Sequence, residues 1–80
     1  METKKISTPK DIGEFVIGQP IELECFVLCG GERTILKHLG SYEGWDKQRK
    51  ILSVRNNGKI EKYGFNPEEN AFDFHYRLFS

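Results

Sequence analysis

The sequence predicts a small, mostly β domain, a curled sheet or barrel of five or six short antiparallel strands with one or two short helical turns. Apolar residues recur at every second position over residues 21–29, and apolar and polar residues alternate over residues 72–78, as strands with a buried face require. Gly-Gly and Asn-Gly pairs supply hairpin turns between apolar runs. Because so many strands in 80 residues must roll up to bury their inner faces, an SH3-like barrel ranks first. An OB-like barrel ranks second, since it needs more chain after the second hairpin.

The polar residues 1–7 are predicted to be a flexible N-terminus that precedes a single β domain over residues 8–80. The domain is expected to begin with a short helical turn. Thr8 takes the cap position, Pro9 the first helical position, and Asp11 lies near the positive end of the dipole.

The first hairpin is predicted from the best strand in the chain, Ile21–Cys29, and from the glycines that follow it. Gly30-Gly31 supplies the positive φ angles of a two-residue turn. The return strand is Arg33–Lys37, and this loop length places Phe26 opposite Ile35.

Residues 39–48 contain two glycines and mixed polarity, which predicts a surface loop. A second hairpin follows over residues 50–65. A three-residue loop at Asn56-Asn57-Gly58 is favoured because it opposes Val54 to Ile60. A two-residue loop would oppose Val54 to a glutamate.

The last part of the chain begins with a helical-turn pattern, Asn66-Pro67-Glu68-Glu69. Within residues 71–79, Phe72, Phe74, Tyr76 and Leu78 occupy every second position, alternating with Asp73, His75, Arg77 and Phe79, so a strand is favoured. A helix that groups Phe72, Tyr76 and Phe79 is the alternative.

Twelve basic residues balance twelve acidic ones, which argues against strong, non-specific polyanion binding. No apolar run reaches the length of a membrane span, and no hydrophobic segment follows the charged start. We therefore expect a cytoplasmic protein without a membrane partner. The sequence predicts no oligomeric state.

One charge asymmetry is hidden by this balance. Residues 46–62 hold six basic and two acidic side chains, a net charge of +4. Cations interleaved with aromatic rings are what single-stranded nucleic acid binds, phosphates to charges and bases to rings. The purely structural alternative is that the lysines lie on the solvent side of an exposed hairpin, while Trp45 and Tyr63 fill the core. The candidate nucleic-acid residues are Tyr42, Trp45, Lys47, Arg49, Lys50, Arg55, Lys59, Lys62 and Tyr63.

Metal binding and catalysis are weighed on Cys25, Cys29, His38 and His75. Cysteines four apart in one strand lie about 13 Å from each other, too far for a disulfide or a zinc knuckle. No nucleophile elbow or phosphate-binding glycine loop occurs. We therefore expect buried thiols, no metal, no cofactor and no enzymatic activity.

The leading hypothesis is thus a non-enzymatic binding module that contacts single-stranded nucleic acid through the basic hairpin. The alternative is a protein-interaction or regulatory factor that docks through an acidic strand face or an edge strand. Its candidate residues are Glu22, Glu24, Glu32 and Phe79.

Overall fold

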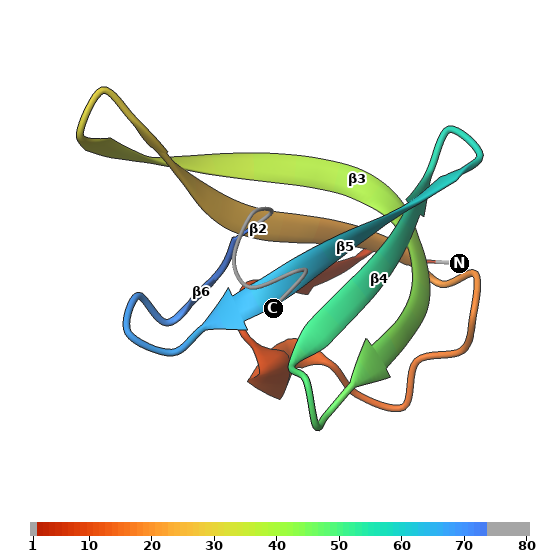
Figure 1. Ribbon diagram of the computed structural model, residues 1–80. Helices are drawn as coiled ribbons and strands as arrows, with labels where there is room; N and C mark the ends of the chain where they lie inside the picture. The colour runs from red at the N-terminus through yellow and green to blue at the C-terminus, as the bar shows by residue number, and fades with distance from the viewer. Residues whose placement is uncertain (1, 74–80) are drawn as a thin grey trace.

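The computed structural model describes residues 2–73, apart from the side chains of Leu28 and Cys29, and its fold is mostly β as predicted. Within these residues, six strands form one sheet, and one short 3-10 helix, η1, lies between the first two strands in the chain (Figure 1). The elements are β1 (Lys4–Ile6), η1 (Pro9–Asp11), β2 (Pro20–Cys29), β3 (Glu32–Asp46), β4 (Ile51–Asn56), β5 (Lys59–Asn66) and β6 (Ala71–Asp73). β6 meets the strand prediction for residues 71–73, and the rest of the predicted strand, residues 74–79, lies outside the described residues.

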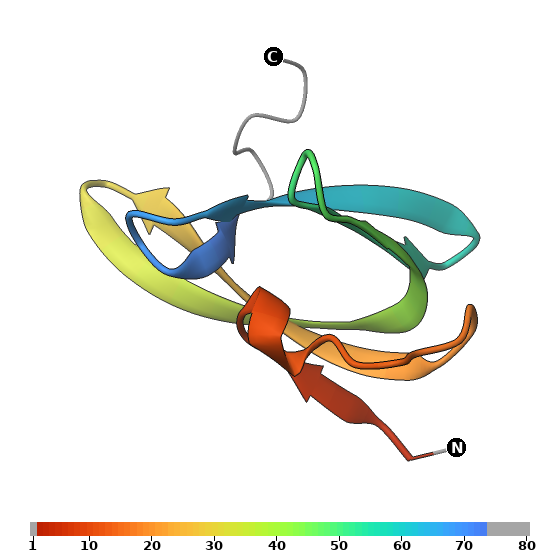
Figure 2. The same cartoon turned by 90° about the horizontal axis from the view of Figure 1, so that it is seen from below.

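The strands follow one another in the sheet in chain order, each antiparallel to the next from β2 to β6. β6 also pairs in parallel with β2, Cys25 opposite Phe72. This pairing closes the sheet into a partial ring, which Figure 2 shows from one end. The chain-order arrangement lacks the Greek-key crossover of an OB-type barrel.

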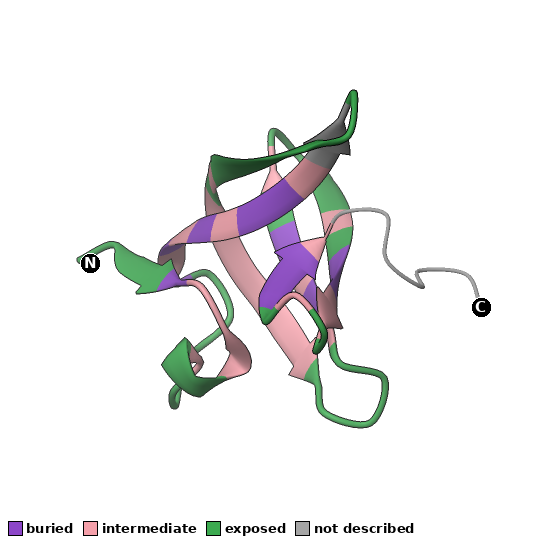
Figure 3. Cartoon of the chain, turned by 90° about the vertical axis from the view of Figure 1, so that its left-hand side faces the viewer, coloured by how far each residue is buried: buried purple, intermediate pink, exposed green. Residues whose placement is uncertain are grey.

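The first hairpin has the predicted two-residue turn and the predicted register, with Phe26 opposite Ile35. β2 and β3 pair from Pro20 to Cys29, and only part of this long hairpin contributes to the ring. Its outer part, residues 26–35, extends away from the ring as an arm (Figure 1). Figure 3 shows buried positions of β2 within the ring and exposed positions along β3 in the arm.

The predicted loop over residues 39–48 is wrong, because β3 continues through that region to Asp46. β3 exchanges partners on the way. Its first part pairs with β2 as far as Ser41, and from Ser41 onward its other edge pairs with β4. Gly40 and Gly44, which suggested a loop, therefore lie in a strand that bends.

Gly40 permits the close approach at this bend. A Cβ atom at Gly40 would lie 2.6 Å from Val54 Cγ1 and 2.7 Å from the carbonyl oxygen of Arg55. Backbone oxygen cannot move aside as a flexible side chain can, so β4 can cross here only over a glycine.

A β-bulge follows between Tyr42 and Gly44, which oppose the neighbouring residues Val54 and Ser53. Gly44 has φ 139°, a value that L-residues avoid. Strict alternation would turn Trp45 outward, whereas the extra residue places it opposite Leu52, on the inner side of the sheet.

The three-residue loop predicted for the second hairpin is also wrong. Asn56 pairs with Lys59, which leaves a two-residue turn at Asn57-Gly58 with φ values of 52° and 78°. Two positive φ angles define the type I′ turn, whose twist matches that of the flanking strands. This twist decides the register, so Val54 opposes Glu61. Ile60 is left opposite Arg55 with 49% of its surface exposed.

The core lies inside the ring. Its fully buried members come from every strand except β3: Ile6, Ile21, Leu23, Cys25, Leu52, Val54, Tyr63 and Phe72. Partly buried Ile12, Phe15, Tyr42, Trp45 and Phe65 pack against it. Ile21, Leu23 and Cys25 of β2 are thus buried on the face that the period-two pattern predicted.

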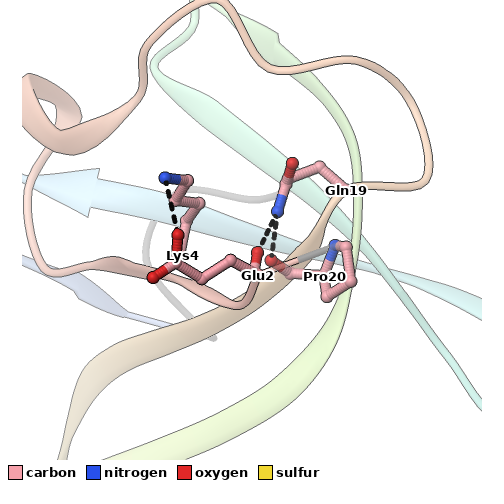
Figure 4. A network of polar contacts seen from close by, with 4 residues as sticks. All are labelled: Glu2, Lys4, Gln19 and Pro20. Atoms are coloured by element: carbon pink, nitrogen blue, oxygen red, sulfur yellow. Dashed lines mark hydrogen bonds and ion pairs between the residues drawn. The ribbon is translucent and has the colours of Figure 1, made fainter.

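The N-terminal segment is more ordered than predicted, because Lys4–Ile6 forms β1 in parallel with β2. Ile6 is completely buried. Buried Gln19 holds the segment in place, since its Nε2 donates to the carbonyl oxygens of Glu2 at 2.6 Å and Pro20 at 3.0 Å (Figure 4). An exposed ion pair joins Lys4 to Glu2 at 3.6 Å.

The two predicted helical starts differ: the first is the 3-10 helix η1, with Thr8 in the N-cap position, and the second is a turn. In η1, Asp11 Oδ2 accepts hydrogen bonds from the backbone N–H groups of Ser7 and Thr8. After β5, Asn66 Oδ1 accepts from the N–H groups of Glu68 and Glu69, but the segment forms a turn that leads into β6 and not a helix. The capping residues were therefore predicted correctly, and only η1 is helical.

The close approach at Gly40 gives a direct prediction for stability. We expect Gly40→Ala to lower the free energy of unfolding by about 3 kcal/mol, because overpacking against backbone has no cheap relief. Gly13→Ala is the matched control, since a Cβ there would meet its nearest side-chain atom at an ordinary 3.7 Å. Urea unfolding of the two variants measures the difference, and equal stabilities would contradict the role given to Gly40.

Candidate nucleic-acid interface

The turn between β3 and β4 carries three of the predicted cations, Lys47, Arg49 and Lys50, all exposed. Asp46 Oδ1 closes this turn by accepting hydrogen bonds from the N–H groups of Gln48 and Arg49, at 3.0 and 3.1 Å. The basic turn, residues 47–50, therefore has a fixed backbone at one end of the ring.

A surface hollow of about 290 Å³ lies beside the basic turn. This outer hollow is lined by Gly44, Trp45, Asp46, Arg49, Ile51, Ser53 and Lys62. Lys62 opposes Ser53, and both neighbours of Ser53 on β4 are buried. The hollow therefore lies mainly on the outward side of β3, β4 and β5.

Electrostatically, the outer hollow has two cations and one carboxylate. In the described part of the chain, Arg49 and Lys62 form no ion pair. The Asp46 carboxylate accepts two backbone hydrogen bonds through one oxygen. Both cations thus remain available to an anionic ligand.

Trp45 belongs to the core and to the outer hollow at once. It is partly buried, and its ring meets Phe72 edge-on with centroids 5.9 Å apart at 85°. It also forms part of the hollow's wall. The core contact fixes the position of the ring.

The two tyrosines of the predicted set are placed differently. Tyr63 is 1% exposed, and burial, with smaller contributions from Glu61 and Cys25, raises its pKa to about 12. The structure thus corrects the prediction that Tyr63 stacks on a base. Tyr42 is partly buried and packs edge-on against Phe15, with centroids 5.6 Å apart.

Arg55 and Lys59 lie at the far end of the β4–β5 hairpin, beside the Asn57-Gly58 turn. Arg55 donates from Nε and Nη2 to Glu43 Oε1, at 3.3 and 3.0 Å. Its charge is therefore already paired. The structure brings together Trp45, Arg49 and Lys62 from the predicted set, and separates Arg55 and Lys59 from them.

The acidic residues of the alternative hypothesis do not form one continuous acidic surface. Glu22 lies opposite Lys5 and Glu24 opposite Lys37, so each acid on β2 has a lysine beside it. Glu24 Oε1 also accepts a 2.6 Å hydrogen bond from Ser7 Oγ. Glu32 is exposed at the tip of the arm, on the other side of the sheet by the alternation of the strand. Phe79 lies outside the described residues.

Of the groups weighed for metal binding or catalysis, the structure describes the side chains of Cys25 and His38. Cys25 is completely buried, and desolvation, with a smaller contribution from Asp73, raises its pKa to about 11. That shift opposes the thiolate that a nucleophile requires. His38 is half-buried and lies 5.7 Å from the Tyr63 ring, centroid to centroid. Among the described residues, no three His, Cys, Asp or Glu side chains gather as metal ligands; the Cys29 side chain and His75 are not among them.

Sequence reasoning missed a second hollow, of about 280 Å³, next to η1. This η1 hollow is lined by Thr8, Pro9, Lys10, Lys50, Phe65 and Asn70. Its members come from four separate parts of the chain, and no local pattern signals that they meet.

Comparisons with known proteins add no assignment to this geometry. No protein-family model matches the chain, and no match was found among curated proteins or solved structures. Within residues 2–73, no helix has the length and apolar character needed to cross a membrane.

The buried thiol predicts a pH dependence of stability. A pKa raised from 9.0 to about 11 in the folded chain means that the unfolded chain releases its proton first. The stabilisation is complete below pH 9 and is lost as the pH rises toward 11. We expect the stability advantage of the wild type over Cys25→Ala to shrink by about 2 kcal/mol between pH 8 and pH 11. Urea unfolding of both proteins measures this advantage, and a constant difference would contradict the shift.

Proposed function

We propose that this protein is a non-enzymatic module that binds single-stranded nucleic acid at the outer hollow and the basic turn. One observation carries the proposal. Two cations without ion pairs in the described part of the chain, Arg49 and Lys62, lie at a surface hollow that Trp45 also lines. Charge for phosphates and an aromatic surface for bases are the two components of such sites.

Each part of the outer hollow has a role in this proposal. Arg49 and Lys62 contact phosphate oxygens, and Arg49 can do so through two N–H groups at once. Gly44 has no side chain and open space in front of it, so a base can approach the backbone closely. The Ser53 hydroxyl can donate to or accept from the edge of a base.

The overall charge of zero limits the affinity that we expect for nucleic acid. Binding depends on the local excess of cations at the basic turn, so we infer a modest affinity that falls with salt. Three phosphate contacts, by Lys47, Arg49 and Lys62, correspond to a slope of about −2 in log K against log salt for a single strand.

A charge-reversal experiment tests the proposal with a control from the same strand. Lys62 and Lys59 both lie on β5, but only Lys62 lines the outer hollow. We expect Arg49→Glu and Lys62→Glu each to weaken binding of a labelled mixed-sequence single strand by about tenfold or more, since a charge-assisted contact contributes about 1.5 to 3 kcal/mol. Lys59→Glu should change the affinity by less than about threefold. Fluorescence anisotropy at low salt measures the affinities, and circular dichroism verifies the fold of each variant.

If the wild type does not bind the strand, or if Lys59→Glu weakens binding as much as Lys62→Glu, the outer hollow is not the nucleic-acid site. Equal effects would mean that net charge alone governs the interaction.

A specific observation favours the alternative of a protein-interaction factor. Over residues 32–40, β3 pairs with β2 along one edge, and no strand within the described residues pairs with its other edge. Ile35 and Leu39, which share the outward side of β3, are 49% and 63% exposed. A partner could add a strand there by main-chain hydrogen bonds. Under this alternative, reversal of Arg49 or Lys62 leaves partner binding unchanged, whereas Ile35→Lys abolishes it.

A further inference from the structure

We propose that the η1 hollow is a second subsite, which takes a further phosphate and base of the strand held at the outer hollow. This inference rests on the proposed function and extends it to residues outside the basic hairpin. The hollow lies between η1, the basic turn, the end of β5 and the turn before β6.

The charge of the η1 hollow suits a phosphate. Lys10 and Lys50 both line it, and no acidic residue does. Neither lysine forms an ion pair within residues 2–73. The acid next to Lys10 in the chain, Asp11, already accepts two backbone hydrogen bonds through its Oδ2 atom, and Glu69, next to Asn70, does not line the hollow. Two exposed ammonium groups therefore border a hollow in which no carboxylate competes for them.

The apolar part of the η1 hollow suits a base. Phe65 is partly buried, and its ring packs edge-on against Phe72 with centroids 5.5 Å apart. Phe65 lines the hollow together with Pro9. The Thr8 hydroxyl and the Asn70 amide add donors and acceptors that can meet the edge of a base.

The frame of the η1 hollow is fixed by contacts far apart in the sequence. The N–H group of Phe65 donates to the carbonyl oxygen of Lys50 at 2.9 Å, which joins β5 to the basic turn. Lys50 and Asn70 have φ values of 57° and 52°, in the left-handed region. Such a conformation costs about 1 to 2 kcal/mol for a residue with a Cβ. Of the two, Lys50 is the residue type that rarely adopts this conformation, since asparagine adopts it readily.

The two hollows are connected through the basic turn. Arg49 lines the outer hollow and Lys50, the next residue, lines the η1 hollow. Their Cα atoms are about 3.8 Å apart. A single strand that leaves the outer hollow over this turn therefore meets the second pair of lysines directly. A short oligonucleotide should occupy only the outer hollow, and a longer one both.

The test compares oligothymidylates of about 4 and about 12 nucleotides, lengths that bracket the site sizes of small single-strand-binding domains. The variant is Lys10→Gln/Lys50→Gln, and the matched control is Lys37→Gln/Lys59→Gln, which removes two exposed lysines away from both hollows. Fluorescence anisotropy over a series of salt concentrations gives affinities and salt slopes. For the longer strand, we expect the slope to fall in magnitude by about 1.4 in the variant, about 0.7 for each phosphate that a lysine no longer neutralises. The variant should weaken binding of the short strand, which meets Lys50 only as part of the basic turn, much less than binding of the longer strand.

Each other result overturns the inference. If the variant binds the longer strand with the wild-type affinity and slope, the η1 hollow is not on the path of the strand, while the outer hollow stands. If both oligonucleotides, or both double variants, lose affinity equally, the lysines act through general electrostatics. If the wild type binds neither oligonucleotide, the proposed function fails and this inference fails with it.

Discussion

The architecture depends on one close approach, where β4 passes over Gly40 of β3. A methyl group at this point would come within 2.7 Å of the Arg55 carbonyl oxygen. Because Gly40 has none, one strand of 15 residues can pair with β2 in its first part and with β4 in its second. This exchange of partners curls the sheet and lets β6 reach β2. The core of this small chain can then form inside the ring.

The candidate site is a consequence of the same strand. The bulge between Tyr42 and Gly44 shifts the alternation of side chains by one residue, which turns Trp45 toward the core and leaves open space at Gly44. Directly beyond, Asp46 closes the basic turn. The outer hollow is thus lined by Trp45, whose ring packs against the core, by Arg49 of the closed turn and by Lys62 of β5. Along β3, Gly40 permits the bend, Trp45 supplies the aromatic ring, and Asp46 closes the basic turn.

Patterns of neighbouring residues predicted much of the fold. Alternation over residues 21–29 and the Gly-Gly turn predicted the longest hairpin and its register, because both depend on local geometry and on one buried face. Glycine occurs both in loops and at close approaches or bulges within strands, however, and this ambiguity caused the wrong prediction over residues 39–48. Gly40 and Gly44 signal a loop by composition, but here they serve a close approach and a bulge. At Asn57-Gly58, turn twist prevailed over the apolar pairing that favoured a longer loop.

The site was less predictable, because it depends on which side of a strand each residue faces. The basic window was visible in the sequence, but Tyr63 points into the core and Arg55 pairs with Glu43. Lys10 and Phe65 join Lys50 only through the folded ring. Two cations from the window and one ring are therefore all that the predicted set contributes to the outer hollow.

The most direct test of a nucleic-acid site at the outer hollow is a backbone amide NMR titration with a mixed-sequence single-stranded oligonucleotide at low salt. We expect the amide signals of residues 44–53 and of Lys62 to shift, those of the arm to stay in place, and the shifts to disappear when salt is added. Shifts confined to residues 32–40, or no shifts at all, would contradict a nucleic-acid site at the basic turn.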